Sequence, residues 1–277
     1  MRLGTVRVGE DRLAAVEREG RWYALGVPAG TPLETVLAAG AGEVARLAAS
    51  ATEPVEDAVP VAPLRPGKIV AIGLNYLDHI REAGMDKPER PLMFAKFPSS
   101  VIGPGDEIVI DDELTERVDW EVELAAVIGS PLRYASEREA LAGVAGYTVA
   151  NDVSARDLQF ADGQWTRGKN LDTFCPLGPV VVTPDEIGDP QALALRTVVN
   201  GETVQNSTTA EMLFGVAELL SHCSRAFTLE PGDVVLTGTP WGCGEFMTPR
   251  RSLRPGDVVE VSVEGIGTLR NPVVGRR

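Results

Sequence analysis

One stretch near the middle of the chain, Val118–Ile128, limits the possible folds more than any other. Its first seven positions alternate between apolar and acidic residues. A period of two is typical of a β-strand, in which successive side chains point to opposite faces. The pattern divides these seven residues into an apolar face and an acidic face: Val118, Trp120, Val122 and Leu124 against Asp119, Glu121 and Glu123. We therefore predict a strand with one buried face and one row of carboxylates.

The row of carboxylates has two explanations. Side chains two apart on a strand lie roughly 7 Å from one another, so three acids in a row repel unless a cation lies among them. A solvated outer face of a sheet would also carry acids, but such a face usually interleaves Lys and Thr, and this one does not. Carboxylate oxygens are ligands that Mg²⁺, Mn²⁺ and Ca²⁺ prefer. We interpret Glu121 and Glu123 as metal ligands.

A third carboxylate follows the predicted strand that begins at Tyr147 and breaks at Asn151-Asp152. Taken alone, Asp152 would be explained as a residue that caps the next turn. Together with Glu121 and Glu123 it completes a set of three protein oxygens. Such a set leaves about three octahedral positions for water or for a chelating substrate, as is usual for Mg²⁺ in enzymes.

Composition and charge exclude several classes of function. The chain has 277 residues, of which 44% are hydrophobic, so it can bury a substantial core. No apolar run approaches the length of a membrane span and the N-terminus does not open a signal peptide, so we expect a soluble, cytoplasmic protein. The net charge of −14 argues against nucleic acid and anionic membranes as partners. An anionic substrate would then need a local cluster of Lys and Arg.

The three cysteines, Cys175, Cys223 and Cys243, are widely spaced and form no Cys-x-x-Cys pair. Neither a disulfide framework nor a zinc site follows from this spacing.

The chain divides into a small N-terminal α/β appendage, residues 1–62, and a main domain, residues 67–277. Helices are predicted only near 33–49, 75–83, 136–142 and 209–225. Three Pro-Gly-Asp turns, at Pro104, Pro231 and Pro255, each precede a short apolar strand. The expected class is therefore a β-rich α+β fold with at least ten strands.

Further candidate residues surround these segments. His79 and Glu82 are three apart on a predicted helix, which is the arrangement of a general base with an orienting acid, and Asn75 is a candidate N-cap. The segment 163–170 nearly matches a phosphate loop, but Asn170 replaces the required hydroxyl residue, so we reject nucleotide binding and keep Lys169 as an anion-binding candidate. The Gly238 and Thr239 loop could hold a carboxylate or oxyanion.

These motifs, taken in order, make the chain resemble the fumarylacetoacetate hydrolase family from about residue 67 to residue 275. The segments that carry the resemblance are Gly73–Tyr76 with His79, Val118–Leu124, Asn151–Asp157, Gly168-Lys169, Pro176–Pro179, Val199–Glu202 and Thr237–Pro240. The resemblance implies a mixed β-sandwich roll of the family's C-terminal domain type and a homodimer. It also implies Mg²⁺ or Mn²⁺ on Glu121, Glu123 and Asp152, with Asp119 supporting the site rather than binding the ion.

The resemblance further implies an enzyme that acts on a small anionic 2-oxo or 2,4-dioxo acid through a metal-bound enolate. His79 oriented by Glu82 would move a proton, and residues 76–91 would close as a lid. Lys169 would polarise a carbonyl, while the distal group would be held by Lys96, Arg156, Gln159, Gly238 and Thr239. Trp241 and Cys243 replace residues that are commonly smaller or aliphatic in relatives, and are expected to narrow the distal pocket.

Three functions remain open at this level. We favour C–C bond cleavage, by an acylpyruvate hydrolase or an oxaloacetate-type decarboxylase, because both His79 and Glu82 are present. The alternative is a hydroxymuconate-type isomerase, such as a 5-carboxymethyl-2-hydroxymuconate or 2-hydroxyhepta-2,4-diene-1,7-dioate isomerase, or a hydratase. The third is a relative that binds oxo acids without turnover.

Overall fold

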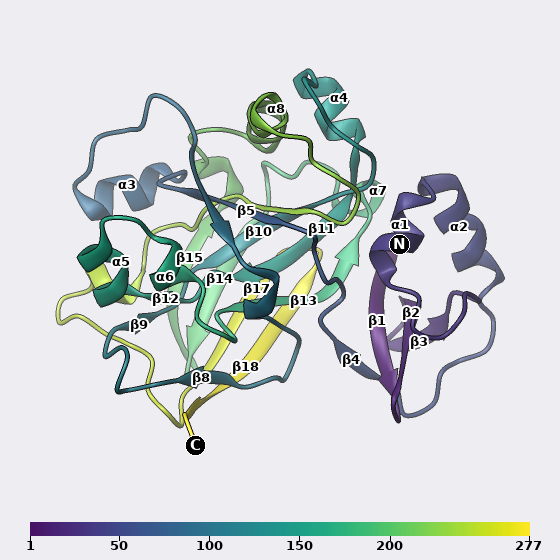
Figure 1. The fold of residues 1–277 in the computed structure, drawn as a ribbon, viewed down its shortest axis with the longest axis horizontal. Coiled ribbons are helices and arrows are strands. Elements are labelled where there is room, and N and C mark those ends of the chain that lie inside the picture. Colours follow the sequence, from purple (N-terminus) through teal and green to yellow (C-terminus); the bar gives the residue numbers. More distant parts are fainter.

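The computed structural model describes all 277 residues, and most of its regular structure is strand (Figure 1). The strands are β1 (Arg2–Val8), β2 (Asp11–Arg18), β3 (Arg21–Ala24), β4 (Val59–Val61), β5 (Ile69–Gly73), β6 (Leu92–Lys96), β7 (Val101–Ile102), β8 (Ile108–Ile110), β9 (Val118–Asp119), β10 (Val122–Ile128), β11 (Val144–Asn151), β12 (Ser154–Ala155), β13 (Cys175–Val182), β14 (Ala194–Val199), β15 (Glu202–Thr208), β16 (Val234–Leu236), β17 (Val258–Val263) and β18 (Gly267–Gly275). The predicted β-rich α+β class is confirmed.

The helices are short and lie around the strands. The α-helices are α1 (Leu33–Ala38), α2 (Ala41–Ser50), α3 (Leu77–Ala83), α4 (Glu137–Ala142), α5 (Arg156–Asp162), α6 (Thr166–Lys169), α7 (Pro184–Ile187) and α8 (Val216–Ala226), and the 3-10 turns are η1 (Pro98–Ser100), η2 (Thr209–Glu211) and η3 (Gly244–Phe246). No helix is both long enough and apolar enough to cross a bilayer.

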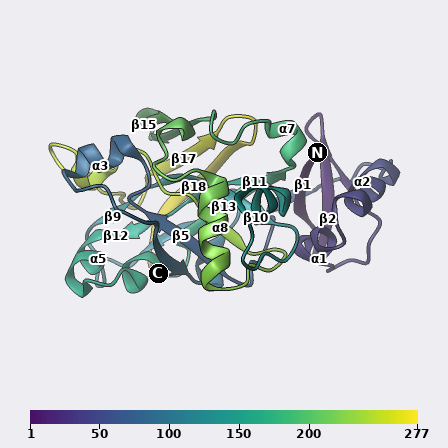
Figure 2. The same cartoon turned by 90° about the horizontal axis from the view of Figure 1, so that it is seen from above.

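Two sheets form the body of the molecule. The larger has the strand order β3-β2-β1-β13-β11-β10-β16-β5-β6, with β4 paired to β1 and β7 to β13. The smaller has the order β15-β14-β17-β18-β8. Its central strands pack against β10, β11 and β13, so a shared apolar core fills the space between the sheets, and α8 contributes Leu219 and Leu220 to that core. The edge strand β6 and the helices α3, α5 and α6 lie on the side away from the N-terminus (Figures 1 and 2).

The stretch Val118–Ile128 is buried on both of its faces, rather than on one face as half-buried strands usually are. Its even positions do enter the larger core cluster, as the alternation predicts, whereas Ala125 and Val127 enter a second cluster on the other face. The strand is also interrupted after β9. There the backbone N–H groups of Glu121 and Val122 donate to the side chains of Asn151 and Gln205 instead of a neighbouring strand. The acidic side chains Asp119, Glu121 and Glu123 are buried as well as the apolar ones.

The three Pro-Gly-Asp turns were correctly predicted and share one geometry. Each glycine has a positive φ, between 80° and 100°, and strands β8, β16 and β17 follow where expected. In each turn the aspartate, Asp106, Asp233 or Asp257, accepts a hydrogen bond from the backbone N–H three residues earlier, over 2.6–2.7 Å. Glycine is required because a side chain at positive φ would be strained.

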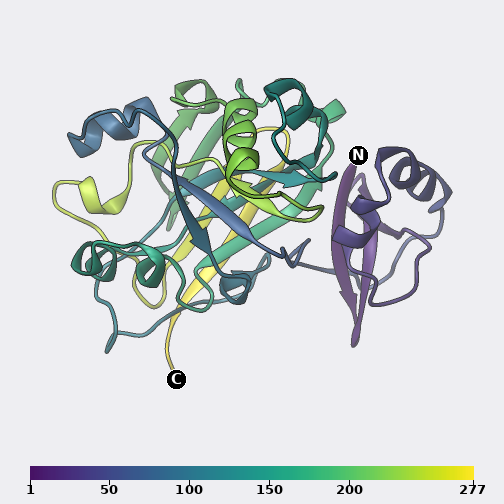
Figure 3. The ribbon, with the colours of Figure 1, turned by 45° about the horizontal axis from the view of Figure 1, so that its top comes forward.

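The N-terminal strands and helices α1 and α2 lie at one end of the molecule (Figure 3). Strand β1 pairs with β2 and β4 and also with β13, so these strands continue the larger sheet. The single helix predicted near 33–49 is wrong: two helices meet at Gly40, whose φ of +90° cannot continue a helix.

Other helix predictions were incomplete. The predicted helix near 209–225 is a 3-10 turn, η2, followed by α8, while the short helices α5, α6 and α7 were missed. They span only four to seven residues, which is too short to show a 3.6-residue period. Asn75 does not cap α3. Tyr76 occupies that position, and the Asn75 amide instead donates to the carbonyl oxygens of Phe214 and Thr237.

Candidate active site

Three buried carboxylates meet where β10 and β11 lie side by side. Glu121 precedes β10, Glu123 lies on it, and Asp152 follows the end of β11; Val122 and Asn151 are paired across the two strands. One oxygen from each carboxylate lies within 4.8 Å of the others. The side chains that the sequence predicted as a set are therefore brought together.

Three cations surround these carboxylates. Lys169 Nζ, from α6, lies 2.7 Å from Glu121 Oε2 and 2.8 Å from Asp152 Oδ2. Lys96 Nζ, from β6, lies 2.6 Å from Asp152 Oδ1. The guanidinium of Arg156, at the start of α5, lies 2.7 Å from Glu121 Oε1. These three cations form a local basic cluster, and each of them pairs with at least one buried carboxylate.

The cations neutralise Glu121 and Asp152 but not Glu123. Burial alone would raise the pKa of Glu121, but Lys169 and Arg156 outweigh it and lower that pKa to about 2. Burial raises the pKa of Glu123 well above its usual range, and the negative charges of Asp152 and Glu121 add to the effect. No lysine or arginine forms an ion pair with Glu123, whose Oε2 accepts only the Gly238 N–H, at 2.6 Å. Glu123 is thus the one carboxylate of the three that has no cationic partner.

The donor set fits a hard divalent cation. All three candidate ligands offer oxygen, which Mg²⁺ and Mn²⁺ prefer over nitrogen or sulfur. A cation shared with Glu123 would also relieve the repulsion among the buried carboxylates. Glu121, Glu123 and Asp152 are the residues that would hold it.

A small cavity of about 60 Å³ opens in front of the carboxylates. Its polar walls are His79, Glu121, Glu123, Arg156, Gln159, Lys169 and Thr239, and its apolar walls include Met85, Phe94, Phe160, Trp165 and Phe246. Most predicted substrate-binding residues therefore line one space. Lys96 and Gly238 do not: Lys96 is buried behind Asp152, and the Gly238 N–H is taken by Glu123.

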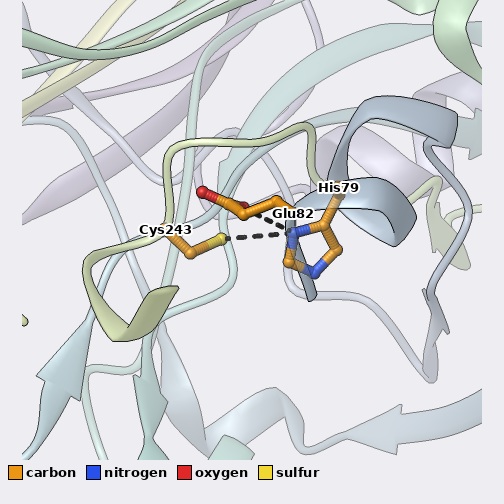
Figure 4. A group of neighbouring side chains, drawn as sticks. All are labelled: His79, Glu82 and Cys243. Atoms are coloured by element: carbon orange, nitrogen blue, oxygen red, sulfur yellow. Dashed lines mark hydrogen bonds and ion pairs between the residues drawn. The ribbon is translucent and has the colours of Figure 1, made fainter. Parts of the chain in front are cut away.

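His79 lies at the edge of this cavity with Glu82 beside it, and both come from α3 (Figure 4). His79 Nδ1 lies 3.1 Å from Glu82 Oε2, and the other Glu82 oxygen accepts the Gly242 N–H over 2.9 Å. Phe246 packs edge-on against the imidazole, at 5.4 Å between ring centroids. These contacts fix the ring so that its second nitrogen points away from Glu82.

Asp119 and Cys243 connect the site to the loop after β16. Asp119 accepts hydrogen bonds from the Gly244 and Glu245 N–H groups and pairs with Arg156 at 2.8 Å. Cys243 is fully buried, and its Sγ lies 4.0 Å from His79 Nδ1. The expected narrowing of the pocket is not seen, because neither Cys243 nor the 45% exposed Trp241 lines the cavity.

Sequence reasoning missed Gln205, on β15. Its side chain accepts the Val122 N–H and donates to Thr239 Oγ1 and Pro240 O, both at 2.9 Å, so it ties β10 to the Thr239 loop. No local motif distinguishes this glutamine from others. Its buried position depends on the packing of the two sheets.

Gly168 allows α6 to approach α5 closely enough to place Lys169. A Cβ at this position would lie 2.7 Å from Gln159 N and 2.8 Å from Ala155 O, both backbone atoms. We expect Gly168→Ala to lower the free energy of unfolding by about 1–3 kcal/mol, because the backbone must shift. Urea denaturation measures the change. Gly42→Ala is the control, since Gly42 lies in α2 with nothing within 4 Å, and it should cost nothing or stabilise by up to about 1 kcal/mol.

Comparison with known proteins identifies a matching family model and related sequences. The family model for the fumarylacetoacetate (FAA) hydrolase C-terminal domain matches residues 68–274. The chain is 46% identical over 268 residues to 2,4-didehydro-3-deoxy-L-rhamnonate hydrolase of Sphingomonas sp. (strain SKA58), covering 96% of this chain and 93% of that protein. It is 48% identical over 212 residues to the mitochondrial oxaloacetate tautomerase FAHD2A of Bos taurus, covering 76% and 67% of the two chains.

A solved structure, the fumarylacetoacetate hydrolase from psychrophilic Exiguobacterium antarcticum, superposes with a TM-score of 0.90. The sequences are 39% identical, and the match covers 100% of both chains. The shared fold therefore includes strands β10 and β11, where the three carboxylates meet, and also the N-terminal strands.

Proposed function

The chain belongs to the fumarylacetoacetate hydrolase family, and from this premise we propose that it is a divalent-metal-dependent enzyme that hydrolyses a carbon–carbon bond in a small 2,4-dioxo acid. The observation that carries the proposal is that His79, oriented by Glu82, lines the same cavity as Glu121 and Glu123. Hydrolysis needs a base that deprotonates water beside a polarised carbonyl group. The name of the rhamnonate hydrolase, which denotes a 2,4-didehydro acid, supports this substrate class.

When bound by Glu121, Glu123 and Asp152, Mg²⁺ or Mn²⁺ would polarise the 2-oxo group and offset the negative charge that develops as the bond breaks. The chain's own residues supply the proton transfers. His79 accepts a proton from water, and Glu82 stabilises the resulting imidazolium. The water oxygen bonds to the C4 carbonyl carbon, the C3–C4 bond breaks, and C3 takes the proton from His79. The products are a carboxylic acid and a shorter 2-oxo acid.

The remaining cavity residues bind and orient the substrate. Lys169, which faces the cavity, would direct its charge at a carbonyl oxygen, while Arg156, Gln159 and Thr239 would hold the distal group. Phe94 and Trp165, in edge-on contact at 5.3 Å, would exclude bulk water. The cavity of about 60 Å³ is well below the roughly 300 Å³ typical of a ligand pocket. Entry of substrate would therefore require the segment 76–91 to move, as a lid does.

A substrate panel with and without a chelator tests the proposal. The panel contains acylpyruvates, oxaloacetate and muconate-type diacids, each with Mg²⁺ or Mn²⁺ and then with excess EDTA. We expect a 2,4-dioxo acid to yield two products whose masses sum to substrate plus water, and EDTA to abolish the reaction. If every acid is left unchanged, the chain is instead an oxo-acid-binding relative without turnover.

The tautomerase relative favours a second candidate. An oxaloacetate tautomerase moves one proton between carbon and oxygen, which His79 could perform without adding water. The product then has the mass of the substrate, so mass spectrometry combined with the loss of the enol absorbance separates the two reactions.

A further inference from the structure

A second set of potential metal ligands lies beside the carboxylates and has a different chemistry. His79 Nδ1, a Glu82 oxygen and Cys243 Sγ all lie within 4.8 Å of one another (Figure 4). Two of these residues come from α3, and the third precedes η3, which is distant in sequence. The packing of α3 against the Gly242 loop creates the set, since the Gly242 N–H donates to Glu82.

The geometry of this set is close to that of a zinc site. Zn²⁺ binds imidazole nitrogen at about 2.0–2.1 Å and thiolate sulfur at about 2.3 Å, usually in a tetrahedron. Those bond lengths place the nitrogen and sulfur about 3.5 Å apart. Here Nδ1 lies 4.0 Å from Sγ and 3.1 Å from Glu82 Oε2. A mixed set of nitrogen, sulfur and oxygen favours Zn²⁺ over Mg²⁺, which prefers oxygen alone.

We infer that His79, Glu82 and Cys243 form a zinc site that switches the enzyme off when it is filled. The inference rests on the proposed function, because it assigns an effect to the base His79. Zinc would take the Nδ1 lone pair and displace the Cys243 thiol proton to solvent. Water would fill the fourth position, as in other sites with three protein ligands.

Zinc binding would change which ring nitrogen of His79 carries the proton. With Nδ1 bound to zinc, the ring proton that faces Glu82 moves from Nδ1 to Nε2, the nitrogen that points away from Glu82 and Cys243 (Figure 4). Nε2 then cannot accept a proton from water. Glu82 would also be held by the metal and could no longer stabilise an imidazolium. The carboxylate set around Glu123 would stay free to bind Mg²⁺.

Access to this set is from the Glu82 side. The Glu82 side chain is 16% exposed, whereas Cys243 is fully buried. The other cysteines provide matched controls, because Cys175 and Cys223 are equally buried but belong to no group of metal-ligand side chains.

Cobalt is the probe for the site, since thiolate bound to Co²⁺ gives a charge-transfer band in the near ultraviolet. The full chain is first saturated with Mg²⁺ to occupy the carboxylate set, and Co²⁺ is then titrated. We expect the band in the wild type and in Cys223→Ser, and its loss in Cys243→Ser. Zn²⁺ should displace Co²⁺ with one ion per chain, and Cys243→Ser should weaken zinc binding by at least about 10- to 100-fold.

The spectrum and the turnover assay test different steps. Absence of the band in the wild type, or an unchanged band in Cys243→Ser, would overturn the site. A band without loss of turnover on zinc loading would overturn the switch. We expect Zn²⁺ to inhibit the wild type and Cys223→Ser, and to spare Cys243→Ser, which keeps the His79–Glu82 pair. If no oxo acid is turned over at all, the proposed function fails, while the cobalt spectrum still decides whether the site exists.

Discussion

Replacing Glu121 with glutamine is expected to remove divalent-metal binding and to lower turnover by on the order of 10³-fold or more. The amide offers one weak oxygen in place of a charged ligand, and loss of the ion removes several kcal/mol of stabilisation of the developing charge, at about 1.4 kcal/mol per tenfold change in rate. Manganese binding followed by electron paramagnetic resonance measures the first effect. A steady-state assay with added Mg²⁺ measures the second.

The same substitution also removes a buried charge, so its effect on stability needs a control. Lys169 and Arg156 would each lose a carboxylate, although Asp152 and Asp119 remain with them. Breaking a buried pair costs about 3–5 kcal/mol, which we take as the upper limit here. Asp233→Asn is the matched control, because Asp233 is a buried partner of Lys68 that does not line the cavity. It should lose stability and keep its metal affinity. Equal loss of manganese binding in both variants would contradict the assignment of Glu121.

Replacing His79 with alanine is expected to lower turnover by about 10²–10⁴-fold while manganese binding is unchanged. Removal of a positioned base typically has an effect of this size. The variant also loses the edge-on contact with Phe246, which costs on the order of 1 kcal/mol and leaves the chain folded. Turnover and manganese affinity are measured on the same preparation.

The prediction requires that turnover falls in the His79 variants while manganese affinity stays the same. Arg81→Ala is the control, because Arg81 lies on the same helix, pairs with Glu211 and is exposed. It should change neither turnover nor affinity. His79→Gln, which retains a polar side chain in the space, should be as inactive as the alanine variant. Unchanged turnover in both His79 variants would remove this residue from the mechanism.

The sequence predicted the residues of the site better than it predicted the residues that surround them. Glu121 and Glu123 share a face of one short stretch, and His79 and Glu82 share a face of one short helix, so local periodicity is enough to relate each pair. Local periodicity could not predict the role of Gln205 or the proximity of Cys243 to His79. Each reaches the site through contacts between segments far apart in the chain, and those contacts exist only after the two sheets have packed.

The errors in the fold have equally local causes. Alternation correctly separated Trp120 and Leu124 from Glu121, but it could not show that the acidic face would be covered by Lys169 and Arg156. Burial of that face required helices α5 and α6, which are too short to be recognised by a period of 3.6 residues. The Pro-Gly-Asp turns were recognised because glycine and aspartate each satisfy a backbone requirement within four residues.

The position of strand β16 in the sheet affects how the chain can fold during its synthesis. It lies between β5 and β10 in the larger sheet, although it is synthesised long after both. Until residues 234–236 leave the ribosome, β5 and β10 each present an open edge to the cell, and open edges invite pairing with other chains. Nascent polypeptides stalled or truncated before this strand should therefore depend on chaperones, and Glu123 acquires its contact with the Gly238 N–H only after residue 238 of the 277 has been synthesised.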